Sequence, residues 1–263
     1  MKKASYLGLW LLLSIALIGF VTFSFADDIS IGAWTPKKAP FKEMLTKDRT
    51  LVELTPEEQK ARLDSIRNVE EEVKVDSAAH SILLIGDSMT LNLAYRLAKY
   101  AKQNGHTFHA VNWDSSNTKT WASCDTLDYF INKYDASYIF VSLGSNELTM
   151  KNPNSRLKYV KTILEKIGDI PYVWIGPPNW TEDFGINTMI EENCKPRSFF
   201  LTNGMKLARK KDRIHPTRDA SADWIDSVAR WMPKSSHPIL MNIPPDTIGK
   251  VNPNVTFLKA WNK

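Results

Sequence analysis

Short apolar runs alternate with amphipathic segments from residue 80 onward. We expect strands at Ser81–Ile85, Thr107–Val111, Ser137–Leu143, Pro171–Ile175 and Ser198–Thr202. Helical periodicity lies between them, at about 90–104, 121–134, 155–168 and 217–232. Strands that read as continuous apolar runs are buried on both faces, which is typical of parallel sheets covered by helices. The pattern predicts a three-layer α/β/α domain over residues 79–233, with a parallel sheet of about five strands.

The N-terminal 26 residues have a different pattern. Lys2 and Lys3 precede an uncharged apolar run over residues 4–26, which ends in Ser24-Phe25-Ala26. A basic start, an apolar stretch and small residues at the end are typical of a secretory signal peptide. The run also approaches the roughly 20 residues that span a bilayer, so an uncleaved membrane anchor through residues 4–26 stays open. Either interpretation predicts an exported protein.

Two further segments flank the predicted domain. Residues 27–78 are predicted to form an N-terminal extension with one helix at about 56–73, because Thr55-Pro56 supplies a cap and a first-turn proline. Residues 234–263 contain Pro238, Pro244, Pro245 and Pro253, and we expect them to form an irregular C-terminal tail.

Composition narrows the classes of partner. The chain has 263 residues, of which 43% are hydrophobic and 24% charged, as in globular proteins. Its net charge of +5 is spread along the sequence, so we expect no nucleic-acid partner. No Cys/His cluster has zinc-ligand spacing, and we expect no metal. Cys124 and Cys194 either pair in an oxidising compartment or stay as two separate buried thiols.

Three polar segments follow predicted strands or precede the last predicted helix, where ligand sites of parallel sheets lie. Gly86-Asp87-Ser88 follows the first strand, and Gly144-Ser145-Asn146 follows the third. Asp212-Arg213-Ile214-His215 precedes the last helix. A serine at a strand-to-helix turn suits a nucleophile, a histidine with a nearby aspartate suits its base, and an asparagine amide suits an oxyanion. Each segment alone is also typical of a cap or turn, and their combination favours a hydrolytic site.

These segments resemble the SGNH hydrolase superfamily, or GDSL-type esterases, over about residues 80–232. The resemblance implies a flavodoxin-like α/β fold without a cofactor. It also implies that Ser88 is the nucleophile, His215 the base and Asp212 its orienting carboxylate. The backbone N–H of Ser88 and the side chain of Asn146 would bind the oxyanion.

The chain departs from the SGNH pattern in the second block. That block usually supplies a glycine N–H to the oxyanion hole, whereas residues 112–118 of this chain contain no glycine. We expect Ser116 to supply this N–H, although the choice among residues 112–118 stays open. Glu147 also stands where aspartate is more usual in the family.

The leading hypothesis is therefore an exported serine esterase, periplasmic or extracellular. It would remove small O-acyl groups such as acetyl from a carbohydrate, a cell-envelope glycan or another small ester. Two alternatives stay open. One is a glycan O-acetyltransferase with the same site, and the other is a non-catalytic envelope-binding protein with a degenerate oxyanion hole.

Overall fold

The computed structural model describes residues 74–202 and 204–259. The expected signal peptide or anchor at residues 1–26, and the expected helix at about 56–73, lie outside the described residues. Within the described residues, no helix has both the length and the apolar character needed to cross a bilayer.

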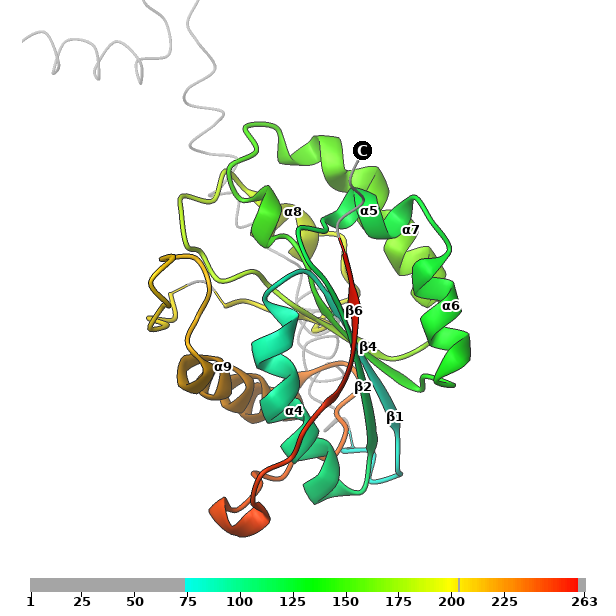
Figure 1. Ribbon diagram of the computed structural model, residues 1–263. Coiled ribbons are helices and arrows are strands. Elements are labelled where there is room, and N and C mark those ends of the chain that lie inside the picture. Colours follow the sequence, from blue (N-terminus) through cyan, green and yellow to red (C-terminus); the bar gives the residue numbers. More distant parts are fainter. Residues whose placement is uncertain (1–73, 203, 260–263) are drawn as a thin grey trace, which may run out of the picture. The chain divides into compact units, whose positions relative to one another are not determined.

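A single sheet of six strands forms the centre of the fold (Figure 1). The strands are β1 (Ser81–Gly86), β2 (Thr107–Trp113), β3 (Tyr138–Ser142), β4 (Tyr172–Ile175), β5 (Phe199–Phe200) and β6 (Asn254–Leu258). Their order is β5-β4-β3-β1-β2-β6, and every neighbouring pair is parallel. The fold class is thus confirmed as α/β, with a flavodoxin-like three-layer arrangement.

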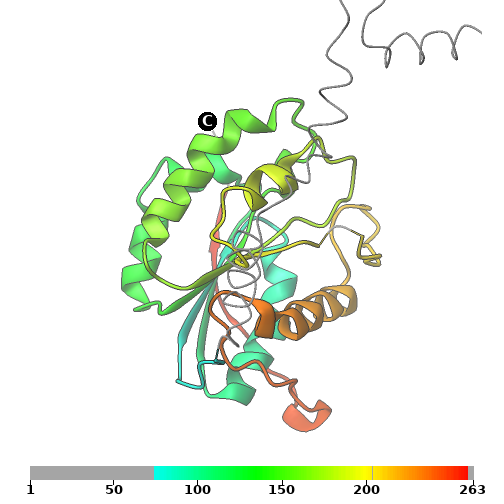
Figure 2. The same ribbon diagram turned by 180° about the vertical axis from the view of Figure 1, so that it is seen from behind.

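Helices cover both faces of the sheet, as Figures 1 and 2 show from opposite sides. One layer contains α4 (Thr90–Asn104) and α9 (Arg218–Trp231), and the other contains α5 (Thr118–Ala122), α6 (Thr126–Lys133), α7 (Leu157–Ile167) and α8 (Ile186–Glu191). The central strand β1 contributes to both cores. Ile82 and Leu84 pack toward α4 and α9, whereas Leu83 and Ile85 pack toward the other layer. This two-sided burial explains the unbroken apolar run.

Three predicted helices lie within two residues of the expected bounds, and two other helical regions differ. The helices α4, α7 and α9 are confirmed, and Thr217 caps α9 by accepting a hydrogen bond from the N–H of Ala220. The single helix expected at 121–134 is instead two, α5 and α6, separated at residues 123–125. Serine and aspartate there favour helix ends. The unpredicted helix α8 begins where Asp183 accepts hydrogen bonds from three backbone N–H groups.

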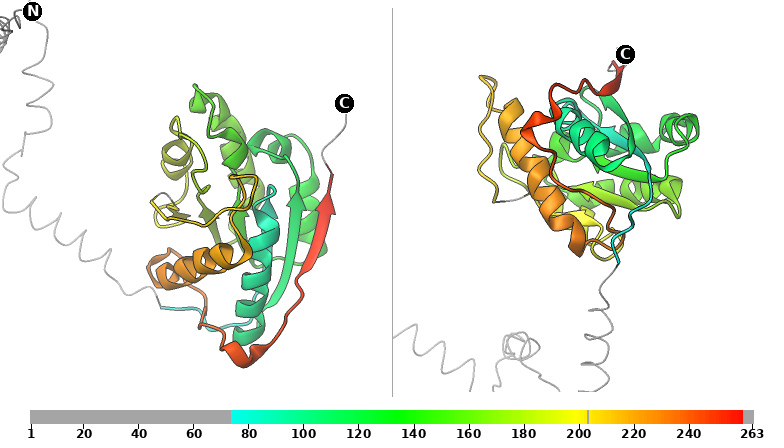
Figure 3. Two further views of the ribbon diagram at one scale, coloured as in Figure 1. Left: turned by 60° about the vertical axis from the view of Figure 1, so that its left-hand side comes forward. Right: turned by 90° about the horizontal axis from the view of Figure 1, so that it is seen from below.

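The expectation of an irregular C-terminal tail is wrong. Its residues 254–258 form β6, which extends the sheet beside β2 (Figure 3), and Ile239 and Met241 lie in the core. The described domain therefore continues past residue 233. The four prolines of this segment all precede residue 254 and so do not interrupt β6, an edge strand with a mostly half-exposed surface. Such a strand lacks the apolar run that marks the buried ones.

The two cysteines are separate thiols in the structure. The Sγ of Cys124 contacts the carbonyl oxygen of Thr120 and the hydroxyl of Thr126. Burial raises the pKa of the Cys194 thiol to about 12. Of the two alternatives for these residues, the structure has the separate thiols.

Truncation of β6 tests its role in the fold. We expect a chain that ends at Pro253 to melt at least about 5 °C below a chain that ends at Lys259. The shorter chain loses the pairing with β2 and the hydrogen bond from Trp113 Nε1 to the carbonyl of Lys259. It also exposes the edge of β2, which favours aggregation. Calorimetry of both truncated chains measures this, and equal melting temperatures would contradict the assignment.

Candidate active site

The segment after β1 places Ser88 at the carboxyl edge of the sheet. The N–H of Asp87 donates to the carbonyl of Ser142 in β3 at 3.1 Å, and the Asp87 carboxylate accepts from the N–H of Met89 at 2.9 Å. A Cβ on Gly86 would lie only 2.1 Å from the oxygen of Ser142. Glycine is therefore needed for the close approach of β1 and β3 that positions Ser88.

Ser88, His215 and Asp212 form one chain of hydrogen bonds. The Oγ of Ser88 lies 2.8 Å from Nε2 of His215, and Nδ1 of His215 lies 3.0 Å from Oδ2 of Asp212. The other carboxylate oxygen of Asp212 accepts from the N–H groups of Ile214 and His215. These backbone bonds, together with the His215 ring, lower the pKa of Asp212 to about 2. Asp212 is thus ionised at neutral pH, and its charge faces the imidazole.

A tight loop holds Asp212 and His215 in place. The N–H of Lys210 donates to the carbonyl of His215 at 2.8 Å, and the guanidinium of Arg209 donates to the carbonyl of Ile214. Asn92, in the first turn of α4, donates its side-chain N–H to the carbonyl of Pro216 at 3.0 Å. This last contact ties the histidine loop to the helix that follows Ser88.

Asn146 lies at the end of β3, beside the β1 segment. Gly144 has a φ of 116°, and a Cβ there would come within 3.2 Å of Ile186 and Ile190. The Asn146 side chain is exposed, and one N–H of its amide donates to the carbonyl of Ser116 at 2.8 Å. The amide retains a second N–H. Asn146 is thus held by the loop over residues 112–118, which we call the second-block loop.

The expected use of the Ser116 N–H is corrected by the structure. This N–H donates to the carbonyl of Trp113 at 3.1 Å and closes a turn. Ser115, inside the turn, has a φ of 60°, in the left-handed region that favours glycine. A serine in a conformation that usually favours glycine therefore occupies this turn. Ser116 instead supplies its carbonyl to Asn146 and its hydroxyl to Trp121 Nε1.

Glu147 makes buried contacts near Asn146 that the sequence did not identify beyond its departure from the family pattern. Its buried carboxylate accepts from the N–H and the hydroxyl of Thr118, the first residue of α5, at 3.1 and 2.6 Å. The Nε of Arg156 lies 3.1 Å from Oε1 of Glu147 and forms an ion pair with it. Burial raises the pKa of Glu147. Glu147 thereby connects the Asn146 segment to the second-block loop.

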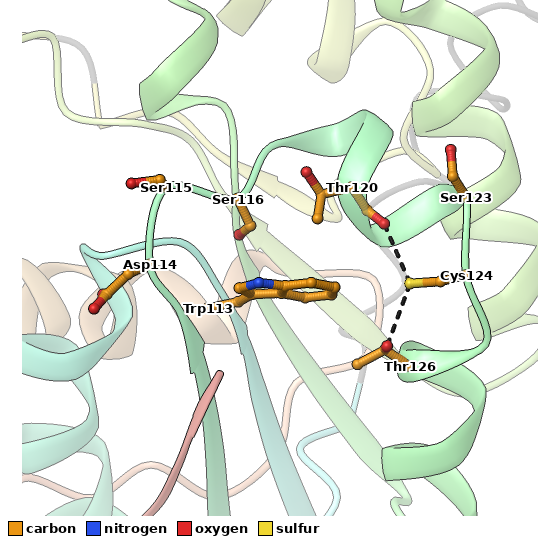
Figure 4. A pocket seen from close by; sticks show the side chains of 8 residues that line it. All are labelled: Trp113, Asp114, Ser115, Ser116, Thr120, Ser123, Cys124 and Thr126. Carbon is orange, nitrogen blue, oxygen red and sulfur yellow. Dashed lines mark hydrogen bonds between the residues drawn. The ribbon is translucent and has the colours of Figure 1, made fainter. Parts of the chain in front are cut away.

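A cavity of about 470 Å³ opens beside this loop. Its wall is mostly hydroxyl-bearing, and it is lined by Trp113, Asp114, Ser115, Ser116, Thr120, Ser123, Cys124 and Thr126. Figure 4 shows the Trp113 indole in the middle of this group. Among the described residues, no cluster of three His, Cys, Asp or Glu side chains is arranged to hold a metal ion.

Comparisons with known proteins do not assign the chain to a family. No family model matches the chain, and no curated protein matches it. Among solved structures, the chain is similar to one described as "BT4096 a gut microbial diltiazem-metabolizing enzyme", with 11% identity and a TM-score of 0.35. The similarity covers 64% of this chain and 38% of that enzyme's chain. At this level it assigns no activity.

The buried Asp87 gives a pH prediction. Burial raises its pKa from 3.8 to about 7, so the folded protein holds a proton that the unfolded chain releases near pH 4. Stability should therefore fall as pH rises from about 4 to 7, by on the order of a few kcal/mol. In Asp87→Asn this contribution is absent, because the side chain stays neutral.

Urea unfolding of both proteins at pH 5, 6, 7 and 8 measures the difference. The raised pKa of Glu147 also makes stability fall with rising pH, and it does so in both proteins. The lowered pKa of Asp212 changes the stability only below about pH 4. The difference between the wild-type and variant slopes thus reports the titration of Asp87 together with its repulsion from Glu147. Equal slopes would contradict the prediction.

Proposed function

We propose that the protein is an SGNH-type serine hydrolase that cleaves small O-acyl esters by acyl transfer. The observation that carries the proposal is the hydrogen-bond chain from Ser88 Oγ through the His215 ring to Asp212. A nucleophile, a base and an orienting acid at these separations form the arrangement of a serine hydrolase triad. Its place beyond β1 and β3, where the strand order diverges, is the usual ligand site of this fold.

In the proposed mechanism, His215 Nε2 takes the proton of Ser88 Oγ while that oxygen attacks the ester carbonyl. The ionised Asp212 stabilises the imidazolium that forms, without taking a proton itself. His215 then protonates the leaving alcohol, and the acyl group stays on Ser88. A water molecule, activated by His215, releases the acid and restores the hydroxyl.

Two donors are suited to the oxyanion. The N–H of Ser88 makes no hydrogen bond with the described residues, and it lies just before α4, where the helix dipole favours negative charge. The second N–H of Asn146 is the other donor, because its first is held by the Ser116 carbonyl. We therefore assign the oxyanion hole to Ser88 and Asn146, without the Ser116 N–H that the sequence favours.

The proposed substrate is an acylated glycan outside the cytoplasm, acetyl being the simplest acyl group. The signal-like residues 1–26 support export, and the SGNH resemblance supports the ester substrate. If a sugar hydroxyl replaces water in the second step, the same site performs O-acetyl transfer. The occupied Ser116 N–H favours the other alternative, a binding protein without catalysis, and the experiments below separate these cases.

The first test is hydrolysis of 4-nitrophenyl acetate by residues 27–263. We expect Ser88→Ala and His215→Ala each to lower kcat/KM by about 10³-fold or more, because each removes a member of the triad. Ser155→Ala and His237→Ala, at exposed positions of the same residue types, serve as matched controls and should retain activity. A folded wild type with neither turnover nor phosphonate labelling of Ser88 would reject the hydrolase and favour the binding protein, whereas labelling without turnover would favour the transferase. Turnover that survives Ser88→Ala would reject the assigned nucleophile.

The second test concerns Asn146. We expect Asn146→Ala to lower kcat by about 10²- to 10³-fold with a small change in KM, because the lost bond forms only in the transition state. Circular dichroism and melting temperature establish that the variant is folded. An unchanged kcat would remove Asn146 from the oxyanion hole.

A further inference from the structure

A second hollow lies between α4, α9 and the segment that leads into β6. It consists of two adjoining cavities of about 150 and 400 Å³, which share Tyr95, Lys99 and Arg218. The smaller is also lined by Asn92, Arg96, Asp219 and Ala222, and the larger by Gly249, Lys250 and Val251. Figure 1 shows the red segment before β6 running across α4. We call this hollow the basic cleft.

The basic cleft has an excess of positive charge. Lys99, Arg218 and Lys250 form no ion pair with the described residues. Arg96 is neutralised, because its guanidinium binds both carboxylate oxygens of Asp226 at 2.6 and 2.9 Å. Asp219 is the one acidic residue in the lining. Like charges held around one hollow repel each other, and an anionic ligand would relieve that repulsion.

Arg218 is held in a conformation suited to binding an anion. Its guanidinium carbon lies 3.4 Å from the centre of the Tyr95 ring, which covers one face of the group, and its N–H edge has no acceptor among the described residues. A planar guanidinium binds carboxylates through two parallel hydrogen bonds. Arg218 is also the first residue of the 14-residue helix α9, whose dipole adds positive potential there.

The basic cleft is close to the proposed catalytic residues. Arg218 follows His215 by three positions, and the bond from Asn92 to the Pro216 carbonyl joins the same two elements. Along α4, Tyr95 lies about 8 Å from the first residue of the helix, just after Ser88. An extended ligand with an ester at Ser88 can therefore reach the cleft with a neighbouring unit.

We propose that the basic cleft binds the carboxylates of an acidic polysaccharide whose ester group reaches Ser88. This proposal rests on the proposed function and narrows its substrate to a polymer of uronic-acid type. The cleft is a hollow of sugar-sized volume with a fixed arginine, which suits a discrete carboxylate better than the flat surface of a membrane. The contributing residues are far apart in the sequence, so the charge is concentrated only by folding.

The test is the binding of de-esterified polygalacturonate to the full-length protein by isothermal titration calorimetry. This polymer has no ester, so the measurement does not depend on catalysis. We expect binding that weakens with added salt, and no comparable binding of an uncharged galactomannan. We expect Lys99→Gln/Arg218→Gln to raise Kd about tenfold or more, since two charged contacts are lost.

Two variants make the result specific. Lys158→Gln/Lys161→Gln removes the same charge from exposed positions on α7, across the sheet, and should change Kd less than twofold. Arg218→Lys keeps the charge above Tyr95 and should lie closer to the wild type than Arg218→Gln. Equal loss of binding in the α7 variant would show that only net charge matters, and it would overturn the proposal.

The remaining outcomes separate the two proposals. Ester cleavage at Ser88 with polygalacturonate affinity unaffected by the Lys99/Arg218 substitutions would overturn the cleft and keep the hydrolase. Cleft-dependent binding without any ester cleavage would support the cleft and reject the hydrolase. Binding of phosphatidylglycerol vesicles through Lys99 and Arg218, with no binding of polygalacturonate, would overturn the cleft in favour of a membrane surface.

Discussion

The contact between Ser88 and His215 joins two residues that lie 127 positions apart, and the rest of the site depends on it. It requires β1 to end at a fixed height beside β3, and α9 to begin at a fixed place beside α4. The first condition is met at Gly86, where no side chain fits between the two strands. The second is met by contacts between α4 and α9, including the Arg96–Asp226 ion pair. The parallel sheet brings these distant segments to one edge.

Buried carboxylates organise the loops around this contact. Asp87 binds the N–H of Met89 at the turn after β1, and Glu147 binds Thr118 at the start of α5. Both groups have raised pKa values because burial disfavours their charge. Their burial costs free energy, which the hydrogen bonds offset only in part. In return, the Ser88 segment and the loop that holds Asn146 are fixed relative to the sheet.

Much of the fold could be predicted from the sequence, because buried parallel strands and amphipathic helices have strong patterns. The strands β1 to β4, the helices α4 and α9, and the proximity of Ser88, Asp212 and His215 at one edge all follow from such patterns. The edge strand β6 could not be predicted, since its half-exposed residues lack the buried-strand pattern. The hydrogen bond that occupies the Ser116 N–H depends on the φ of Ser115, for which serine gives no signal. The role of Glu147 and the basic cleft depend on tertiary contacts alone.

The central claim is that Ser88 is a nucleophile activated by His215, and covalent labelling tests it most directly. The protein is treated with a fluorophosphonate at neutral pH, digested and mapped by mass spectrometry. We predict a single phosphonyl adduct on Ser88, formed much more slowly in His215→Ala, because the imidazole no longer takes the proton. No adduct on a folded wild-type protein, or an adduct at another serine, would contradict the account.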